Sequence, residues 1–88
     1  MTFPVLLTPK AAKSLRKLRR SVGPRISEAL KILERSPEAG EQLKPSRFWN
    51  IRVVDYRVVY EIDRPSNRVI VLFVGHRKNV YDEFSRLV

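Results

Sequence analysis

Three β-like segments follow one another in the second half of the chain, and they restrict its fold more than any other feature. They run over residues 48–54, 56–63 and 69–76 and are rich in β-branched and aromatic side chains. Asp55 alone separates the first two segments, and residues 64–67 form a tight connection between the last two. Because connections this short join antiparallel neighbours, the pattern predicts a three-stranded meander.

The first half of the chain predicts one strand and two helices. Residues 3–7 are a short apolar run, and Pro4 favours an edge position because proline cannot donate a ladder hydrogen bond. Thr8 followed by proline is a good helix start, and the first helix should end near Ser21. A second helix should span residues 23–36. We expect the two helices to form an antiparallel pair that covers one face of the sheet.

Two segments remain, a loop and a tail. Residues 37–46 contain two prolines and a glycine and predict a loop. Residues 79–88 have apolar side chains at helical spacing and predict a short terminal helix. The predicted fold is therefore a single α+β domain over residues 1–88. It has an N-terminal strand, an antiparallel two-helix hairpin on a mainly antiparallel four-stranded sheet, and a short C-terminal helix.

The composition excludes several kinds of site. The chain has 88 residues and no cysteine, so disulfides, thiolate metal sites and cysteine nucleophiles are ruled out. One histidine makes a zinc site improbable, and we expect neither a metal nor another cofactor. The apolar runs are shorter than the ~20 residues that a membrane-spanning helix needs. Residues 1–7 lack the basic start of a signal peptide, so we expect a cytoplasmic protein without a membrane partner.

Positive charge is concentrated in the predicted helices. The chain carries a net charge of +9, and residues 9–35 hold nine Lys/Arg and two Asp/Glu, a net +7. Such a surface attracts polyanions through counterion release, and it would equally attract an acidic protein. The alternative is that these charges are simply solvated on the helix surfaces.

Period-two alternation sorts the strand side chains onto two faces. The more apolar set of each strand should pack on the helices. The opposite, open face should then carry Asn50, Arg52, Arg57 and Glu61, and Arg77 at the end of the third strand could join them. Several cations on one face predict a phosphate site, and in a chain this basic the natural ligand is RNA.

RNA cleaves itself when its 2′-hydroxyl is aligned on the adjacent phosphate, and no metal is required. The reaction needs a base, cations for the developing charge and an acid for the leaving oxygen. Arg52, Arg57 and Arg77 could supply the cations. His76 is the side chain whose ordinary pKa lies near neutrality, and Tyr81 could stack on a base.

Each of these residues also has a structural interpretation. A lone histidine at a strand end is more often structural than catalytic, and Arg57 could pair with Glu61, four positions along the chain on the same face. Spacing alone therefore supports only a basic α+β domain with an anion site.

The chain resembles toxins of the RelE/ParE superfamily, on its RelE side, over nearly its whole length. Four local matches carry the resemblance: Gln42-Leu43-Lys44, Trp49-Asn50-Ile51-Arg52-Val53, Asp55-Tyr56-Arg57-Val58-Val59-Tyr60-Glu61-Ile62, and Val74-Gly75-His76-Arg77 with Val80-Tyr81. Members are small basic proteins of type II toxin–antitoxin pairs. The resemblance implies a ribosome-dependent endoribonuclease that cleaves mRNA in the A site and inhibits translation.

The same resemblance assigns roles to residues. Arg57 matches the arginine that holds the scissile phosphate, and Arg77 matches a second phosphate and transition-state group. Tyr81 matches a tyrosine that follows it. Arg52 falls at the position of one catalytic lysine and Asn50 at that of another, so this chain lacks a lysine base at position 50. His76 could substitute, because several relatives carry Gly-His-Arg there.

Partners also follow from the resemblance. It implies an acidic RelB-like antitoxin, the ribosome and mRNA, and operator DNA bound only through the antitoxin. The RNA-binding surface should include these residues: Lys13, Arg16, Lys17, Arg20, Lys44, Arg47, Asn50 and Lys78. Two alternatives stay open, a ParE-like inhibitor of DNA gyrase and a weakly active toxin that acts mainly in a repressor complex.

Overall fold

The computed structural model describes residues 2–18, 20–44 and 46–76 of the chain. The elements in chain order are β1 (Val5–Leu7), α1 (Pro9–Leu18), α2 (Gly23–Arg35), the single 3₁₀ turn η1 (Pro37–Ala39), β2 (Glu41–Gln42), β3 (Phe48–Val53), β4 (Tyr56–Asp63) and β5 (Arg68–His76).

The strands form one mixed sheet in the order β1-β5-β4-β3-β2. β3, β4 and β5 make the predicted antiparallel meander, and β1 pairs with β5 in parallel at one edge. The sheet has five strands and not the predicted four. The additional strand is β2, which lies inside the predicted loop 37–46 and pairs Gln42 with Trp49 of β3. Two residues are too short to show any alternation, so the sequence pattern could not reveal this strand.

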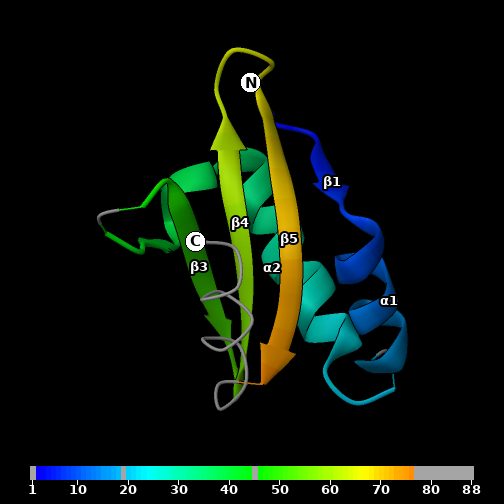
Figure 1. Ribbon diagram of the computed structural model, residues 1–88. Helices are drawn as coiled ribbons and strands as arrows, with labels where there is room; N and C mark the ends of the chain where they lie inside the picture. Colours follow the sequence, from blue (N-terminus) through cyan, green and yellow to red (C-terminus); the bar gives the residue numbers. More distant parts are fainter. Residues whose placement is uncertain (1, 19, 45, 77–88) are drawn as a thin grey trace.

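Both helices lie on one face of the sheet (Figure 1). Thr8 starts α1 as predicted, because its Oγ1 accepts a hydrogen bond from the Ala11 backbone N–H at 3.2 Å. The same hydroxyl donates to the Leu72 carbonyl at 2.8 Å, which ties the start of α1 to β5. The main core fills the space between helices and sheet, and its largest fully buried side chains include Ile26, Leu33, Val58 and Tyr60.

The open face of the sheet carries a second, smaller apolar cluster. Phe48, Val59 and Phe73 are all buried there, with Leu43 and Leu72 packed beside them. The alternation of β3 and β4 agrees with the prediction, but this face is apolar at its centre, with Arg52 and Arg57 toward one end and Glu61 toward the other.

The predicted terminal helix, residues 79–88, lies outside the described residues. Within the described part of the chain, no helix is long and apolar enough to cross a membrane.

Candidate anion site on the open face of the sheet

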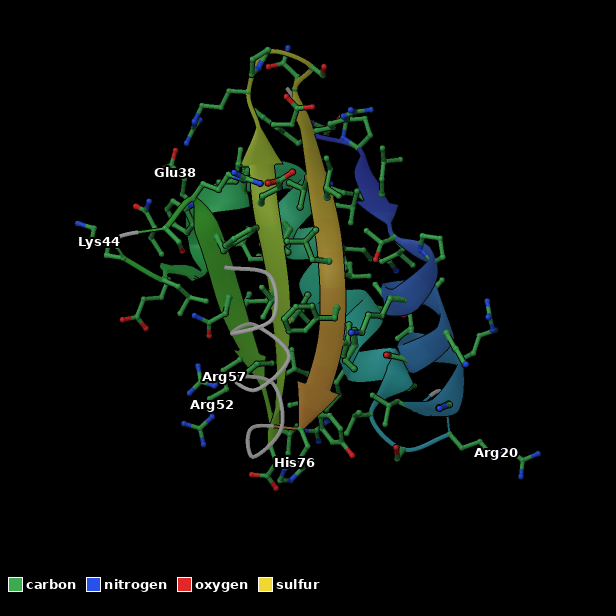
Figure 2. All side chains as sticks on the ribbon, viewed as in Figure 1. Arg20, Glu38, Lys44, Arg52, Arg57 and His76 are labelled. Atoms are coloured by element: carbon green, nitrogen blue, oxygen red, sulfur yellow. The ribbon has the colours of Figure 1, made fainter. Side chains whose placement is uncertain are left out.

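Two arginines face each other across the β3–β4 pair. Arg52 and Arg57 are directly opposite in the antiparallel register, so both side chains lie on the open face (Figure 2). Arg52 is exposed and its Nε donates to the Val54 carbonyl at 3.1 Å. Like charges placed opposite each other on a sheet are unfavourable for folding. An anion bound between or above them would relieve this repulsion.

Asn50 anchors one of these arginines. Its Oδ1 accepts a hydrogen bond from Arg57 Nη1 at 2.6 Å, and its Nδ2 donates to the Glu41 carbonyl at 3.2 Å. The side chain is 3 % exposed, whereas Arg57 is partly exposed. The guanidinium of Arg57 is thus held by a buried amide at one nitrogen while the side chain reaches the surface.

A depression of about 330 Å³ lies against these side chains, and its lining consists of Ala39, Gly40, Glu41, Asn50, Ile51, Arg52 and Arg57. This volume is at the lower end of the range for small-molecule sites and suits a nucleotide-sized group. One wall is the main chain between η1 and β2, and the opposite wall carries the two arginines. Among the described lining residues, Glu41 is the acidic one.

Tyr60 fixes the main-chain wall of the depression. Its hydroxyl donates to the Pro37 carbonyl at 2.7 Å and accepts from the Gly40 N–H at 3.1 Å. Burial raises the pKa of Tyr60 to about 12, and the Gly40 N–H opposes that rise. A Cβ at Gly40 would clash with the Asn50 carbonyl oxygen and with the Tyr60 hydroxyl, so this close approach requires glycine.

His76 does not join the arginines. It is opposite Tyr56 in the register, and the two rings contact edge to face with centroids 5.4 Å apart. Gly75, not His76, is opposite Arg57, so His76 shares the face of Tyr56 and the helices. The cause is a bulge between Val59 and Tyr60 that leaves Leu72 with no opposing residue in β4. One extra residue inverts the faces of the strand beyond it.

The remaining predicted RNA-binding residues lie apart from this site. Arg47 forms an ion pair with Glu61 at 2.9 Å. The ion-pair partner of Glu61 is therefore Arg47, and the side chain of Arg57 donates its hydrogen bond to Asn50. Lys44 is exposed in the turn after β2. Arg20 lies beyond the end of α1, on the far side of the molecule from Arg52 and Arg57 (Figure 2). These residues are all exposed on α1 or just after it: Lys13, Arg16, Lys17 and Arg20.

Three further predicted site residues, Arg77, Lys78 and Tyr81, lie outside the described part of the chain. Sequence reasoning missed Gly40, Glu41 and the hydroxyl of Tyr60 as parts of the site. A glycine and an acidic residue within a loop gave no periodic signal. The one available signal was the glycine itself, because a glycine in a loop can mark a close approach of the main chain to another element.

Comparison with known proteins identifies the family. The sequence model described as "ParE toxin of type II toxin-antitoxin system, parDE" matches residues 5–81. The chain belongs to the RelE/ParE superfamily of toxins. No curated protein matches the chain.

Several solved structures of toxins from this superfamily share the fold. A chain of the RelBE2 toxin–antitoxin complex from Mycobacterium tuberculosis is 29% identical, with a TM-score of 0.78 over 86% of this chain and 99% of that one. A free mutant of toxin RelE from E. coli is 26% identical over the whole of both chains, with a TM-score of 0.80. The archaeal RelE–RelB complex from Pyrococcus horikoshii is 26% identical over 88% of this chain and 97% of that one, with a TM-score of 0.71. The RelE/ParE resemblance and the RelE-like α+β fold are therefore confirmed.

Proposed function

We propose that this RelE/ParE toxin is a cytoplasmic, ribosome-dependent endoribonuclease that cleaves mRNA in the A site without a metal and so inhibits translation. The observation that carries the proposal is the pair of arginines, Arg52 and Arg57, directly opposite each other beside a nucleotide-sized depression. Two planar guanidinium groups on one open face suit a phosphodiester. The similarity to RelE structures over the full chain supports the same conclusion.

In the proposed reaction the arginines act on the scissile phosphate. Arg57, held at Nη1 by Asn50, contacts a non-bridging oxygen and stabilises the charge that develops on it. Arg52, which is more exposed, supplies a second positive charge from the neighbouring strand. Arg77 and Tyr81 would add their contacts from beyond β5, as the family resemblance implies.

Proton transfer needs a different group from the arginines. Asn50 has no titrating group, and His76 lies on the opposite face of the sheet. Glu41 lines the depression and carries a carboxylate that could accept the 2′-hydroxyl proton. We therefore assign the role of base to Glu41 in this proposal, in place of the missing lysine. The 2′-oxygen then bonds to phosphorus, the bond from phosphorus to the 5′-oxygen breaks, and water supplies the proton that the leaving 5′-oxygen takes up.

The direct test is cleavage on programmed ribosomes. Purified toxin should cut an mRNA within the codon in the A site, in single-turnover reactions on preformed ribosome complexes. Induced expression should arrest translation and give cuts within codons, mapped by primer extension. Intact mRNA in both assays would reject the proposal.

A second function is favoured by one observation, the match of residues 5–81 to the family described for ParE. A ParE-like toxin would act on DNA gyrase and leave mRNA intact. Trapped gyrase–DNA complexes in toxin-expressing cells, with uncut mRNA, would support this alternative. A toxin that does neither and represses its operon normally would be a weak toxin acting mainly in a repressor complex.

The proposed regulator is an acidic, RelB-like antitoxin. Two of the similar structures contain a toxin together with its antitoxin. The basic face over α1 and α2 gives the charge complement for such a partner, which would also carry the complex to operator DNA.

A further inference from the structure

We propose that Asn50 is a positioning residue that fixes the orientation of the Arg57 guanidinium toward the depression. This inference rests on the proposed mRNA cleavage for its catalytic meaning. Its structural content, a buried amide that orders an arginine, can be tested without any activity.

The hydrogen bonds fix the orientation of the amide. Nδ2 donates to the Glu41 carbonyl at 3.2 Å, and Oδ1 accepts from Arg57 Nη1 at 2.6 Å. A flipped amide would set its oxygen against that carbonyl and its N–H groups against the guanidinium, so both contacts would be repulsive. The observed orientation is therefore the one in which Asn50 presents an acceptor to Arg57.

The backbone that holds Asn50 is itself braced. Glu41 is opposite Asn50 in the β2–β3 register, and the preceding Gly40 N–H is bound to the Tyr60 hydroxyl. Tyr60 is fully buried, and its hydroxyl also reaches the Pro37 carbonyl. The hydrogen bonds thus connect the core to the guanidinium through η1, β2 and the Asn50 amide.

The consequence is a pre-oriented cation. An arginine side chain is long and loses rotamer freedom when it binds a ligand, and this loss is reduced when a buried acceptor already orders it. A lysine at position 50 would have three donors and no acceptor, so it could not hold Arg57 and would repel it. A lysine at position 50 would supply a positive charge itself, whereas Asn50 orients the positive charge of Arg57.

The first experiment measures the order of Arg57 in the free protein. In ¹⁵N NMR spectra, the Arg57 guanidinium of the wild type should show slow rotation about the Nε–Cζ bond, with separate Nη1 and Nη2 signals assigned by their loss in Arg57→Ala. In Asn50→Ala these signals should average. Equal averaging in both proteins, or resolved signals in both, would overturn the inference, whether or not the protein cleaves RNA.

The second experiment is a double-mutant cycle in single-turnover cleavage on programmed ribosomes. Asn50→Ala should lower the cleavage rate constant roughly 10- to 100-fold, as misplaced catalytic groups do, with little change in the half-saturating toxin concentration. In the Arg57→Ala background the same substitution should have almost no effect, because its target is gone. Full additivity of the two effects would overturn the positioning role.

A matched control separates positioning from general damage. Gln42→Ala removes another side-chain hydrogen bond from β2, that of Gln42 Nε2 to the Ser46 carbonyl at 3.0 Å, without touching Arg57. It should leave both the Arg57 spectrum and the cleavage rate unchanged. If the wild type does not cleave mRNA, the proposed function fails while the NMR comparison still decides the inference.

Discussion

At the scale of single residues, the proposed function assigns its main phosphate contact among the described side chains to Arg57. It is partly buried, bonded to Asn50 and directed to the depression. Arg57→Ala should reduce cleavage about 100- to 1000-fold, the usual loss for one transition-state charge contact. No cavity should form, since the side chain belongs to neither apolar cluster, but the lost hydrogen bond to the buried Asn50 amide should cost about 1–3 kcal/mol of stability.

The matched control for this variant is Arg68→Ala. Arg68 also lies on the sheet, in an exposed ion pair with Asp63 at 2.8 Å, which contributes little to stability. Growth arrest by Arg68→Ala and none by Arg57→Ala, with both proteins folded at the growth temperature, is the expected result. Full toxicity of Arg57→Ala would remove this arginine from the mechanism.

Glu41 provides a separate residue-scale test of proton transfer. Glu41→Gln keeps the size of the side chain and the backbone carbonyl that Asn50 uses, but it removes the titrating group. If Glu41 is the base, cleavage should fall about 100-fold or more, while ribosome binding is retained. An unchanged rate across the pH range would show that the base is another group.

Tyr60 makes a prediction about alkaline stability. Its pKa is raised from the usual 10.0 to about 12 by burial, so the folded protein keeps this proton where the unfolded chain loses it. The contribution of Tyr60 to the free energy of unfolding should therefore be constant below pH 10 and be lost between about pH 10 and 12. Tyr60→Phe should lower stability at neutral pH, because the Gly40 N–H and Pro37 carbonyl lose their partner, and it should flatten this alkaline fall. Urea unfolding across the pH range measures both effects, and identical alkaline slopes would contradict the assignment.

At the scale of elements, the turn between β3 and β4 carries backbone strain. Val54 has a φ of 57°, a left-handed conformation that is costly for a β-branched residue, and its side chain is exposed. Val54→Asn should stabilise the protein by about 1 kcal/mol, or about 4–8 °C in Tm, since asparagine tolerates this conformation.

The reverse control is Asn67→Val in the next turn, where φ is 53°; it should destabilise by a similar amount. Calorimetry that finds no gain for Val54→Asn would show that the turn relaxes at no cost.

The side-chain faces of strands with regular alternation could be predicted from the sequence. The face beyond a one-residue bulge, and a strand of two residues, could not. β3 and β4 alternate regularly, so Asn50, Arg52 and Arg57 were correctly placed on the open face. In β5 the run Val69–Val74 is apolar throughout, so nothing marked the bulge at Leu72 that turns His76 to the other face. β2 is too short to show a period, although its Glu41 carbonyl and the neighbouring Gly40 complete the site.

At the scale of the whole molecule, the two faces of the protein differ in the groups that they carry. The open face carries the candidate anion site toward one end and a small apolar cluster at its centre. The helical face carries most of the net charge of +9. Because α1 and α2 lie on the face of the sheet opposite Arg52 and Arg57 (Figure 1), charges on the outer surfaces of these helices should affect encounter with partners more than the chemical step.

This division predicts how reversing charges on α1 will act. Lys13 and Lys17 are exposed and one helical turn apart, and Lys13→Glu/Lys17→Glu should slow association with ribosomes about tenfold at low salt, with a weaker salt dependence. The cleavage rate constant of prebound complexes should not change.

The control is Lys31→Glu/Arg35→Glu, which makes the same change in net charge on α2. Stopped-flow association with fluorescent ribosomes compares the two pairs. Equal slowing by both would show that only net charge matters and that α1 makes no direct contact, whereas a loss confined to the α1 pair would locate the contact on that helix.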